Sequence, residues 1–296
     1  MEEDHLEIAG VTLSLNSDRL ILSHEPDPGY QGFLKKTNSP PDIRVRFDRS
    51  ILPDTDHLPK IFDSGQSWSM FKNGTWYLVV LSPPALNTAP VWIARFDRSF
   101  KDVIVYLGER MVHETPEGVR VLNPVRYPMD QILLMYFLAD RRGVLAHAAG
   151  VAFDGKGYIF PGRSGAGKST LSRQFSCDHD LEILSDDRMV IREIGDTLRA
   201  YGTPWPGEAG IAINRGVPLS GIFFIRHGSQ NGIRKMERKE ALESLFPVVS
   251  VPWYDEPVMT EILDFCADLL GRVSAYELHF KPDVEVVDVF KTFVSQ

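Results

Sequence analysis

The stretch that decides the fold is Gly162–Ser169, which reads GRSGAGKS. It satisfies the pattern Gly-x-x-x-x-Gly-Lys-Ser/Thr at every fixed position. Glycines let the backbone curl so that several N–H groups converge on one anion, and a helix starting near Lys168 adds the positive end of its dipole. The sequence therefore predicts a phosphate-binding loop with the members Gly162, Arg163, Ser164, Gly165, Ala166, Gly167, Lys168, Ser169 and, next along the chain, Thr170.

Two side chains of this loop carry specific expectations. Lys168 should place its charge against the β- and γ-phosphates of ATP, and Ser169 should offer its hydroxyl to Mg²⁺. The alternative is a chance glycine-rich turn, which average composition would produce in roughly one sequence in a hundred of this length. An apolar segment before the loop and an amphipathic segment with Leu171 and Phe175 after it favour the phosphate site.

Upstream of the loop the sequence indicates a β-hairpin. Residues 144–153 are apolar, residues 154–157 read Asp-Gly-Lys-Gly, and residues 158–160 are apolar again. The hairpin leads directly into the loop, whereas GTPases, transporter ATPases and helicases usually reach it through parallel crossovers. The sequence also contains neither Asn-Lys-x-Asp nor Leu-Ser-Gly-Gly-Gln. These observations argue against those three classes.

Downstream of the loop, an apolar strand at residues 181–184 ends in Ser185, Asp186 and Asp187. Strand ends in α/β sheets face the ligand crevice. One carboxylate can hold Mg²⁺, directly or through water, and the other can accept the proton of an attacking hydroxyl. We expect the adjacent acids to raise one of the two pKa values, which suits a base. The alternative is an ordinary acidic turn.

Other candidates lie in three places. His147 stands among small apolar residues at the start of the hairpin; it is either a core histidine or part of the site. Glu208 belongs to a glycine- and proline-rich loop at residues 202–210, and such loops often cover active sites. Arg226 and His227 close a predicted strand at residues 222–225, from which they can reach phosphate.

This arrangement resembles the HPr serine kinase/phosphorylase family and its relative, phosphoenolpyruvate carboxykinase, over roughly residues 143–214. His147 lies twenty-one residues before Lys168, the loop matches Gly-x-Ser-Gly-x-Gly-Lys-Ser, and residues 185–187 match Ala-Asp-Asp. Residues 208–214 look like a shortened Glu-Ile-Arg-Gly-Leu-Gly-Ile-Ile-Asn segment that lacks its arginine. The first half does not match the regulatory domain of HPr kinases.

The resemblance implies an ATP- and Mg²⁺-dependent transfer of a phosphoryl group to a serine-like hydroxyl of a protein, peptide or small molecule. Asp187 would be the proton acceptor, His147 would orient Asp187 or the phosphoryl group, and Ser169, Asp186 and Glu208 would hold the metal. Two alternatives stay open: a carboxykinase-like enzyme acting on a small acid, for which no arginine pocket is visible, and a nucleotide-binding regulator without catalysis.

The rest of the 296-residue chain predicts the domain organisation. Alternating segments and turn clusters predict a β-rich N-terminal domain at residues 1–125. Residues 126–296 should form the phosphate-loop domain, of α/β type and, by the resemblance, HPr-kinase-like, with a connecting helix at about 128–142 that ends at a Gly143 cap. Overall we expect an α+β protein.

Composition limits the partners. The chain is 43% hydrophobic with a net charge of −8, so it should be globular without the basic face of a nucleic-acid binder. It has two cysteines, an acidic N-terminus without an apolar leader, and no apolar run long enough to span a bilayer. We expect a cytoplasmic protein without membrane partners. Assembly with copies of itself stays open.

Overall fold

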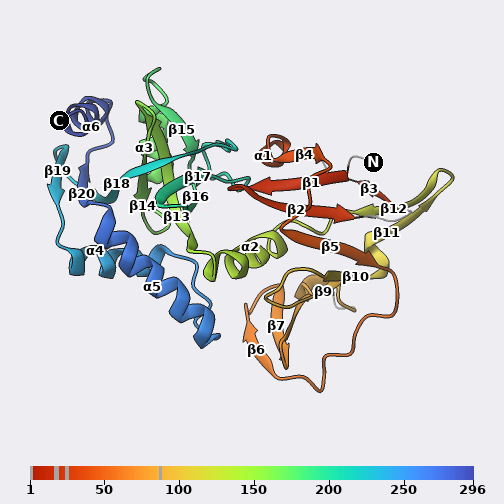
Figure 1. Cartoon of the computed structure of the whole chain (residues 1–296). Helices are drawn as coiled ribbons and strands as arrows, with labels where there is room; N and C mark the ends of the chain where they lie inside the picture. Colours follow the sequence, from red (N-terminus) through yellow and green to blue (C-terminus); the bar gives the residue numbers. More distant parts are fainter. Residues whose placement is uncertain (1–2, 17–19, 24–26, 87–88) are drawn as a thin grey trace. The chain divides into compact units, whose positions relative to one another are not determined.

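The computed structural model describes residues 3–16, 20–23, 27–86 and 89–296. It divides the chain into two compact units; in Figure 1 the green to blue part belongs to unit 2, together with a short red segment at α1. Unit 1 comprises Met1–Pro28 and Leu34–Phe137, and unit 2 comprises Gly29–Phe33 and Leu138–Gln296. Both contain sheets and helices, so the chain is mixed α and β. Among the described residues, no helix is both long and apolar enough to cross a membrane.

Unit 1 is built mainly from two sheets. The larger has the strand order β4-β1-β2-β5-β10-β9-β8-β7-β6, and the smaller has the order β11-β12-β3. Its strands are β1 (Glu3–Ile8), β2 (Val11–Asn16), β3 (Leu20–Ser23), β4 (Leu34–Thr37), β5 (Ile43–Asp48), β6 (Lys60–Asp63), β7 (Trp68–Asn73), β8 (Trp76–Leu81), β9 (Trp92–Phe96), β10 (Val103–Leu107), β11 (Val112–Thr115) and β12 (Gly118–Leu122). Its short helices are η1 (Pro84–Leu86) and η2 (Glu109–Met111), whereas α1 (Pro28–Gln31) lies almost entirely in the Gly29–Phe33 segment of unit 2.

Helix α2 (Met129–Ala139) contributes to the core of unit 1. The Tyr136 ring lies 5.0 Å from that of Tyr77 and 5.4 Å from that of Phe96, and Phe137 packs on Phe100. These aromatic contacts hold the helix up to Phe137 in unit 1. The expected extension of the helix to residue 142 with a Gly143 cap is wrong. The chain turns through a left-handed residue, Arg142 (φ 51°), and Gly143 already begins the next strand.

Unit 2 contains an eight-stranded sheet with the order β14-β13-β16-β17-β18-β20-β19, in which β15 pairs with β13. Because β14 also pairs with β18, the five strands β14, β13, β16, β17 and β18 form a closed ring of paired strands. The strands are β13 (Gly143–Phe153), β14 (Lys156–Pro161), β15 (Glu182–Ser185), β16 (Arg188–Ile194), β17 (Thr197–Gly202), β18 (Gly216–His227), β19 (Gly232–Lys235) and β20 (Ala275–Phe280).

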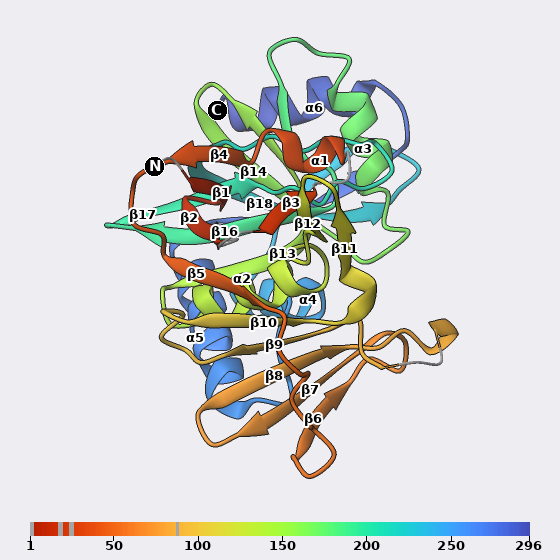
Figure 2. The ribbon, with the colours of Figure 1, turned by 90° about the vertical axis from the view of Figure 1, so that its right-hand side faces the viewer.

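The remaining helices cover this sheet on two sides. They are α3 (Lys168–Phe175), α4 (Arg238–Leu245), η3 (Phe246–Val248), α5 (Glu256–Arg272) and α6 (Glu285–Val294). In both ribbon views α3 and α6 lie on one side of the sheet and α4 and α5 on the other (Figures 1 and 2). Aromatic side chains from β14, α3, β18 and α6 meet in one buried cluster, with Phe160, Phe175, Phe223 and Phe290 at its centre. This cluster fixes α3 against the strand that precedes it.

The strong local patterns are confirmed. The hairpin and the strands predicted at residues 181–184 and 222–225 exist, with shifts of a residue or two and a longer β18, and alternating segments of the predicted β-rich region form strands that include β2, β5, β8, β9 and β10. The strands with weaker alternation and helix α6 were not predicted.

Candidate functional site

The hairpin brings a histidine to the start of the glycine loop. Strands β13 and β14 pair with Ala148 opposite Pro161, and their turn uses two left-handed residues, Asp154 (φ 48°) and Gly155 (φ 71°). Beyond the last strand pair, the Gly162 amide donates to the His147 carbonyl at 3.2 Å. The local Asp-Gly turn thus sets the register that places His147 beside the loop.

The loop itself has the curled backbone that the sequence predicts. Gly165 (φ 80°) and Gly167 (φ 97°) are left-handed, and Gly167 is the N-cap residue of α3. A Cβ at Gly162 would lie 2.8 Å from the Cβ of Ala166, so this position has no room for a side chain. The loop joins the end of a buried strand to the N-terminus of a helix, where backbone N–H groups lack helical partners.

The lysine lies inside the curl. Its side chain is buried, and Lys168 Nζ donates to the carbonyls of Gly162 at 3.0 Å and Arg163 at 3.3 Å. Burial lowers the pKa of Lys168, with Arg188 adding to this effect, while the nearby charges of Asp187 and Asp186 oppose it. The ammonium is thus a desolvated charge held by neutral carbonyls, and an anion bound in the loop would be a stronger partner.

Histidine and the second aspartate form a pair. His147 Nε2 lies 2.7 Å from Asp187 Oδ1, and Arg188 Nε lies 3.4 Å from Asp187 Oδ2. The Ala148 amide also donates to the Asp187 carbonyl at 2.9 Å, which ties the end of β15 to β13. Both side chains of the pair are partly exposed, at 21% and 29%. The pair is therefore positioned by two strands and still open to a ligand.

The expectation that the adjacent acids raise a pKa is wrong for Asp187. Burial by itself raises the pKa of Asp187, but the hydrogen bond and charge of His147, with Arg188 and Lys168, outweigh it and leave the pKa below the ordinary aspartate value. Positively charged side chains lie near the Asp187 carboxylate. The oxygens of Asp186 accept hydrogen bonds from backbone amides of the 207–211 loop instead. Asp187 is therefore ionised throughout the neutral range and can accept a proton or hydrogen bond there.

The first aspartate holds a loop. Asp186 is fully buried, and its carboxylate accepts hydrogen bonds from the amides of Gly207 at 2.8 Å, Ala209 at 2.7 Å and Ile211 at 3.2 Å. The first two amides flank Glu208. A Cβ at Gly207 would meet Asp186 Oδ2 at 2.8 Å, so glycine permits the close approach. Asp186 thereby fixes the backbone that carries Glu208.

We expect Asp186→Asn to destabilise this loop. An amide side chain has one oxygen acceptor, and its NH₂ group would face at least one of the three backbone donors. The expected loss of unfolding free energy is about 2 kcal/mol. Urea denaturation measures it, and hydrogen exchange of residues 207–211 should accelerate. Glu208→Gln is the matched control. Its side chain is 84% exposed, so its effect should stay within about 0.5 kcal/mol. Equal stability of both variants would contradict the assigned role of Asp186.

One hollow of about 460 Å³ collects most of the predicted site. Its lining comes from β13, the glycine loop, α3, the end of β15 and the Asp186-held loop, and consists of His147, Ser164, Gly165, Gly167, Lys168, Ser169, Thr170, Asp187, Gly207 and Glu208. Gly162, Arg163 and Ala166 line a neighbouring hollow instead. Asp186 lines neither. Sequence reasoning missed Arg188, whose only signal is its position directly after the aspartates.

Comparisons with known proteins do not assign the chain to a family. No protein-family model matches the sequence, and neither does any curated protein. Among solved structures, the chain is similar to the HPr(Ser) kinase/phosphatase from Coxiella burnetii, with 12% identity and a TM-score of 0.30, over 51% of this chain and 88% of that chain. A similarity at this level carries no argument, so the functional conclusion rests on the residues of the site.

Proposed function

We propose that this chain transfers the γ-phosphoryl group of ATP to a serine-like hydroxyl of a protein, peptide or small molecule. The observation that supports it most is the His147–Asp187 pair, which shares one hollow with Lys168 and Ser169 of the glycine loop. A site that only binds a nucleotide needs the loop but has no use for an ionised carboxylate held by a histidine beside it. Phosphoryl transfer needs both.

Each side chain then has a task. The amides of residues 164–168 and the Lys168 ammonium bind the phosphates, and Lys168 exchanges its carbonyl partners for phosphate oxygens. Asp187 accepts the proton of the attacking hydroxyl, and His147 holds Asp187 in place. A lowered pKa makes Asp187 a weak base. This suits a loose transition state, in which positioning and charge stabilisation matter more than base strength.

The donors around the hollow fit a magnesium ion bound mainly through the triphosphate. The described residues contain no group of three His, Cys, Asp or Glu side chains that would form a protein-only metal site. Mg²⁺ usually takes one or two protein oxygens besides phosphates and water. Ser169 and Glu208 line the hollow and would hold it, and the ion would neutralise charge on the phosphates. Asp186 fits less well, because its oxygens already accept three amides; we propose that it supports Glu208.

The proposal is tested with γ-labelled ATP, Mg²⁺ and a panel of serine-containing peptides. Label should appear on a hydroxyl acceptor, and chelation of Mg²⁺ should abolish the transfer. Binding of ATP without labelled acceptor and without ADP formation would contradict the proposal and favour a nucleotide-binding regulator. A carboxykinase-like reaction has less support, because this hollow has no arginine among the described residues that line it.

A pH profile tests the pair. Removal of His147 takes away the main influences that lower the Asp187 pKa and leaves the burial that raises it. Since only ionised Asp187 accepts a proton, His147→Ala should move the acid limb of kcat/KM to higher pH. In the native chain this limb should lie below the ordinary aspartate pKa of about 3.9. His113→Ala, an exposed histidine in unit 1, should leave the profile unchanged. An unshifted limb in His147→Ala would contradict the pairing.

We also propose that the chain acts in the cytoplasm. Both cysteines are free, Cys177 exposed and Cys266 buried. Burial raises the pKa of Cys266 to about 12, so this thiol is inert. A pair of free thiols fits the reducing cytoplasm, where ATP is also available.

A further inference from the structure

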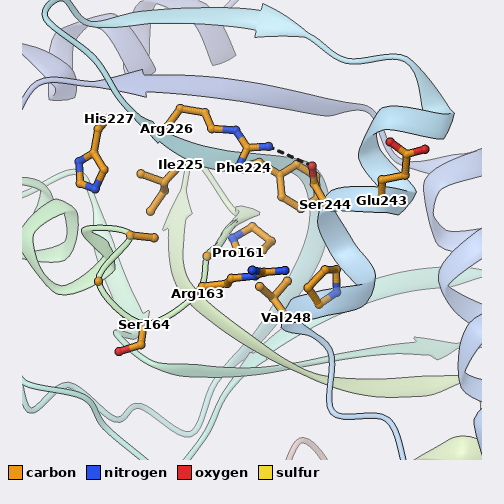
Figure 3. A pocket seen from close by; sticks show the side chains of 14 residues that line it. Pro161, Arg163, Ser164, Phe224, Ile225, Arg226, His227, Glu243, Ser244 and Val248 are labelled. Atoms are coloured by element: carbon orange, nitrogen blue, oxygen red, sulfur yellow. Dashed lines mark hydrogen bonds between the residues drawn. The ribbon is translucent and has the colours of Figure 1, made fainter. Parts of the chain in front are cut away.

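A second hollow, of about 490 Å³, lies beside the glycine loop (Figure 3). It shares Ser164 and Gly165 with the hollow described above, so the two adjoin at the loop. Its other walls come from the end of β14, the last residues of β18, α4 and η3. These segments are up to about ninety residues apart in sequence, and none of them carries a recognised motif.

The two hollows differ in chemistry. Asp187, His147 and Glu208 line the first hollow and are absent from the second. An acceptor hydroxyl must therefore enter from the first, next to Asp187. The second has apolar walls of Pro161, Phe224, Ile225, Pro247 and Val248. A triphosphate lying along the loop places its γ-end at Asp187, and the rest of the nucleotide then extends away from the acceptor.

The sheet topology also favours the second hollow as the side toward which the nucleotide extends. β14 and β18 are parallel neighbours, with Ile159 opposite Ile222, so their carboxyl ends lie at one edge of the sheet. Ligands of α/β sheets bind outside such ends. β18 ends with His227, whose Cε1 would lie 3.9 Å from a Cβ on Gly167. The end of β18 thus borders the loop on the side that leads into the second hollow.

The polar groups of the second hollow suit a base and a sugar. Arg226 is occupied, since it donates to Glu277 at 2.9 Å and to Ser244 Oγ at 3.1 Å, the contact drawn in Figure 3. Arg163 and Glu243 are exposed and form no ion pair with any residue in the described part of the chain. A guanidinium stacks well on an aromatic base. An unpaired carboxylate accepts hydrogen bonds from ribose hydroxyls or an exocyclic amine.

We infer that the second hollow, between the glycine loop, β18 and the α4–η3 segment, binds the nucleoside of the triphosphate. The base packs on Pro247 and Val248 with the Arg163 guanidinium over its face, and Glu243 and Ser244 supply polar contacts. The volume lies within the range of about 300–1,000 Å³ that is usual for small-molecule sites. This inference rests on the proposed function, because it assigns the nucleoside of the same substrate.

The test compares MgATP with magnesium tripolyphosphate, which has the phosphates and no nucleoside. Ser244→Trp fills the second hollow and should raise the Kd of MgATP at least about tenfold, with less than about a twofold change for tripolyphosphate, by calorimetry. Glu243→Ala removes an exposed side chain without threat to folding and should weaken MgATP about threefold, again without effect on tripolyphosphate. Ser295→Trp, the same change on an exposed residue near the C-terminus, should alter neither.

The outcomes separate the two proposals. Equal weakening of both ligands by Ser244→Trp and Glu243→Ala, or no change in either, would overturn the nucleoside site and leave the phosphate site standing. A native chain that binds tripolyphosphate as tightly as ATP would also overturn it. A native chain that binds neither ligand would overturn the proposed function itself. If Ser244→Trp does not fold, Glu243→Ala decides.

Discussion

Asp187→Asn should lose about three orders of magnitude in the rate of phosphoryl transfer while it still binds MgATP. General bases contribute about 10²–10⁴-fold, and asparagine has the same shape without the proton affinity. The asparagine oxygen can keep a hydrogen bond to His147, so the local geometry should survive. Because the carboxylate lies on the acceptor side of the hollow, the loss should appear in kcat, with little change in the Kd of MgATP.

Single-turnover transfer and equilibrium binding measure the two quantities separately. Asp154→Asn, in the turn of the β13–β14 hairpin, is the matched control, since asparagine tolerates the left-handed backbone there and the residue does not line the hollow. Full transfer by Asp187→Asn, in a preparation where Lys168→Ala is inactive, would show that the base assignment is wrong while the phosphate site is right.

Lys168→Ala should lose both binding and transfer. The Lys168 ammonium is already desolvated inside the loop. An anion can therefore bind to it without a further desolvation cost for the lysine. One charge-assisted hydrogen bond corresponds to about 1.5–3 kcal/mol, or roughly ten- to a hundredfold in the Kd of MgATP. Loss of one donor to charge that develops in the transition state costs a further 10²–10³-fold, roughly, in kcat.

Calorimetry with MgATP and single-turnover transfer again give the two effects. Lys156→Ala, at an exposed lysine of the β13–β14 hairpin, should change neither quantity. Lys168→Ala removes only contacts to two loop carbonyls, so thermal unfolding should change little. A variant that folds, binds MgATP normally and transfers at the native rate would remove the glycine loop from the mechanism.

Much of the site was predictable because its signals are local. An Asp-Gly turn between apolar segments predicts the hairpin, glycines at fixed spacing predict the loop, and the apolar run before Asp186 predicts β15. Such signals depend on backbone preferences within a few residues. For His147 the sequence left a core position and a site position open, and the register of the folded hairpin places it next to the loop.

The roles of the two aspartates were not predictable. Asp186 and Asp187 are chemically identical neighbours, and the sequence assigned the metal to one and the proton to the other only through a resemblance. Their partners lie 21–25 residues away for Asp186 and 40 away for Asp187. Successive side chains at a strand end point to opposite sides, so one meets backbone amides and the other meets His147. The neighbouring opposite charges also lower the pKa of Asp187, whereas the sequence predicted a raised pKa for one of the two aspartates.

By itself, the sequence determined a glycine loop entered from a hairpin and followed by a strand with two acids. Those features follow from torsional preferences and apolar periodicity along continuous segments. Only the tertiary structure decided that Asp186 holds the Glu208 loop, that Asp187 pairs with His147, and that β18 and α4 wall a second hollow beside the loop. These facts depend on packing between segments distant in the chain, and local preferences carry no information about which side chains such packing brings together.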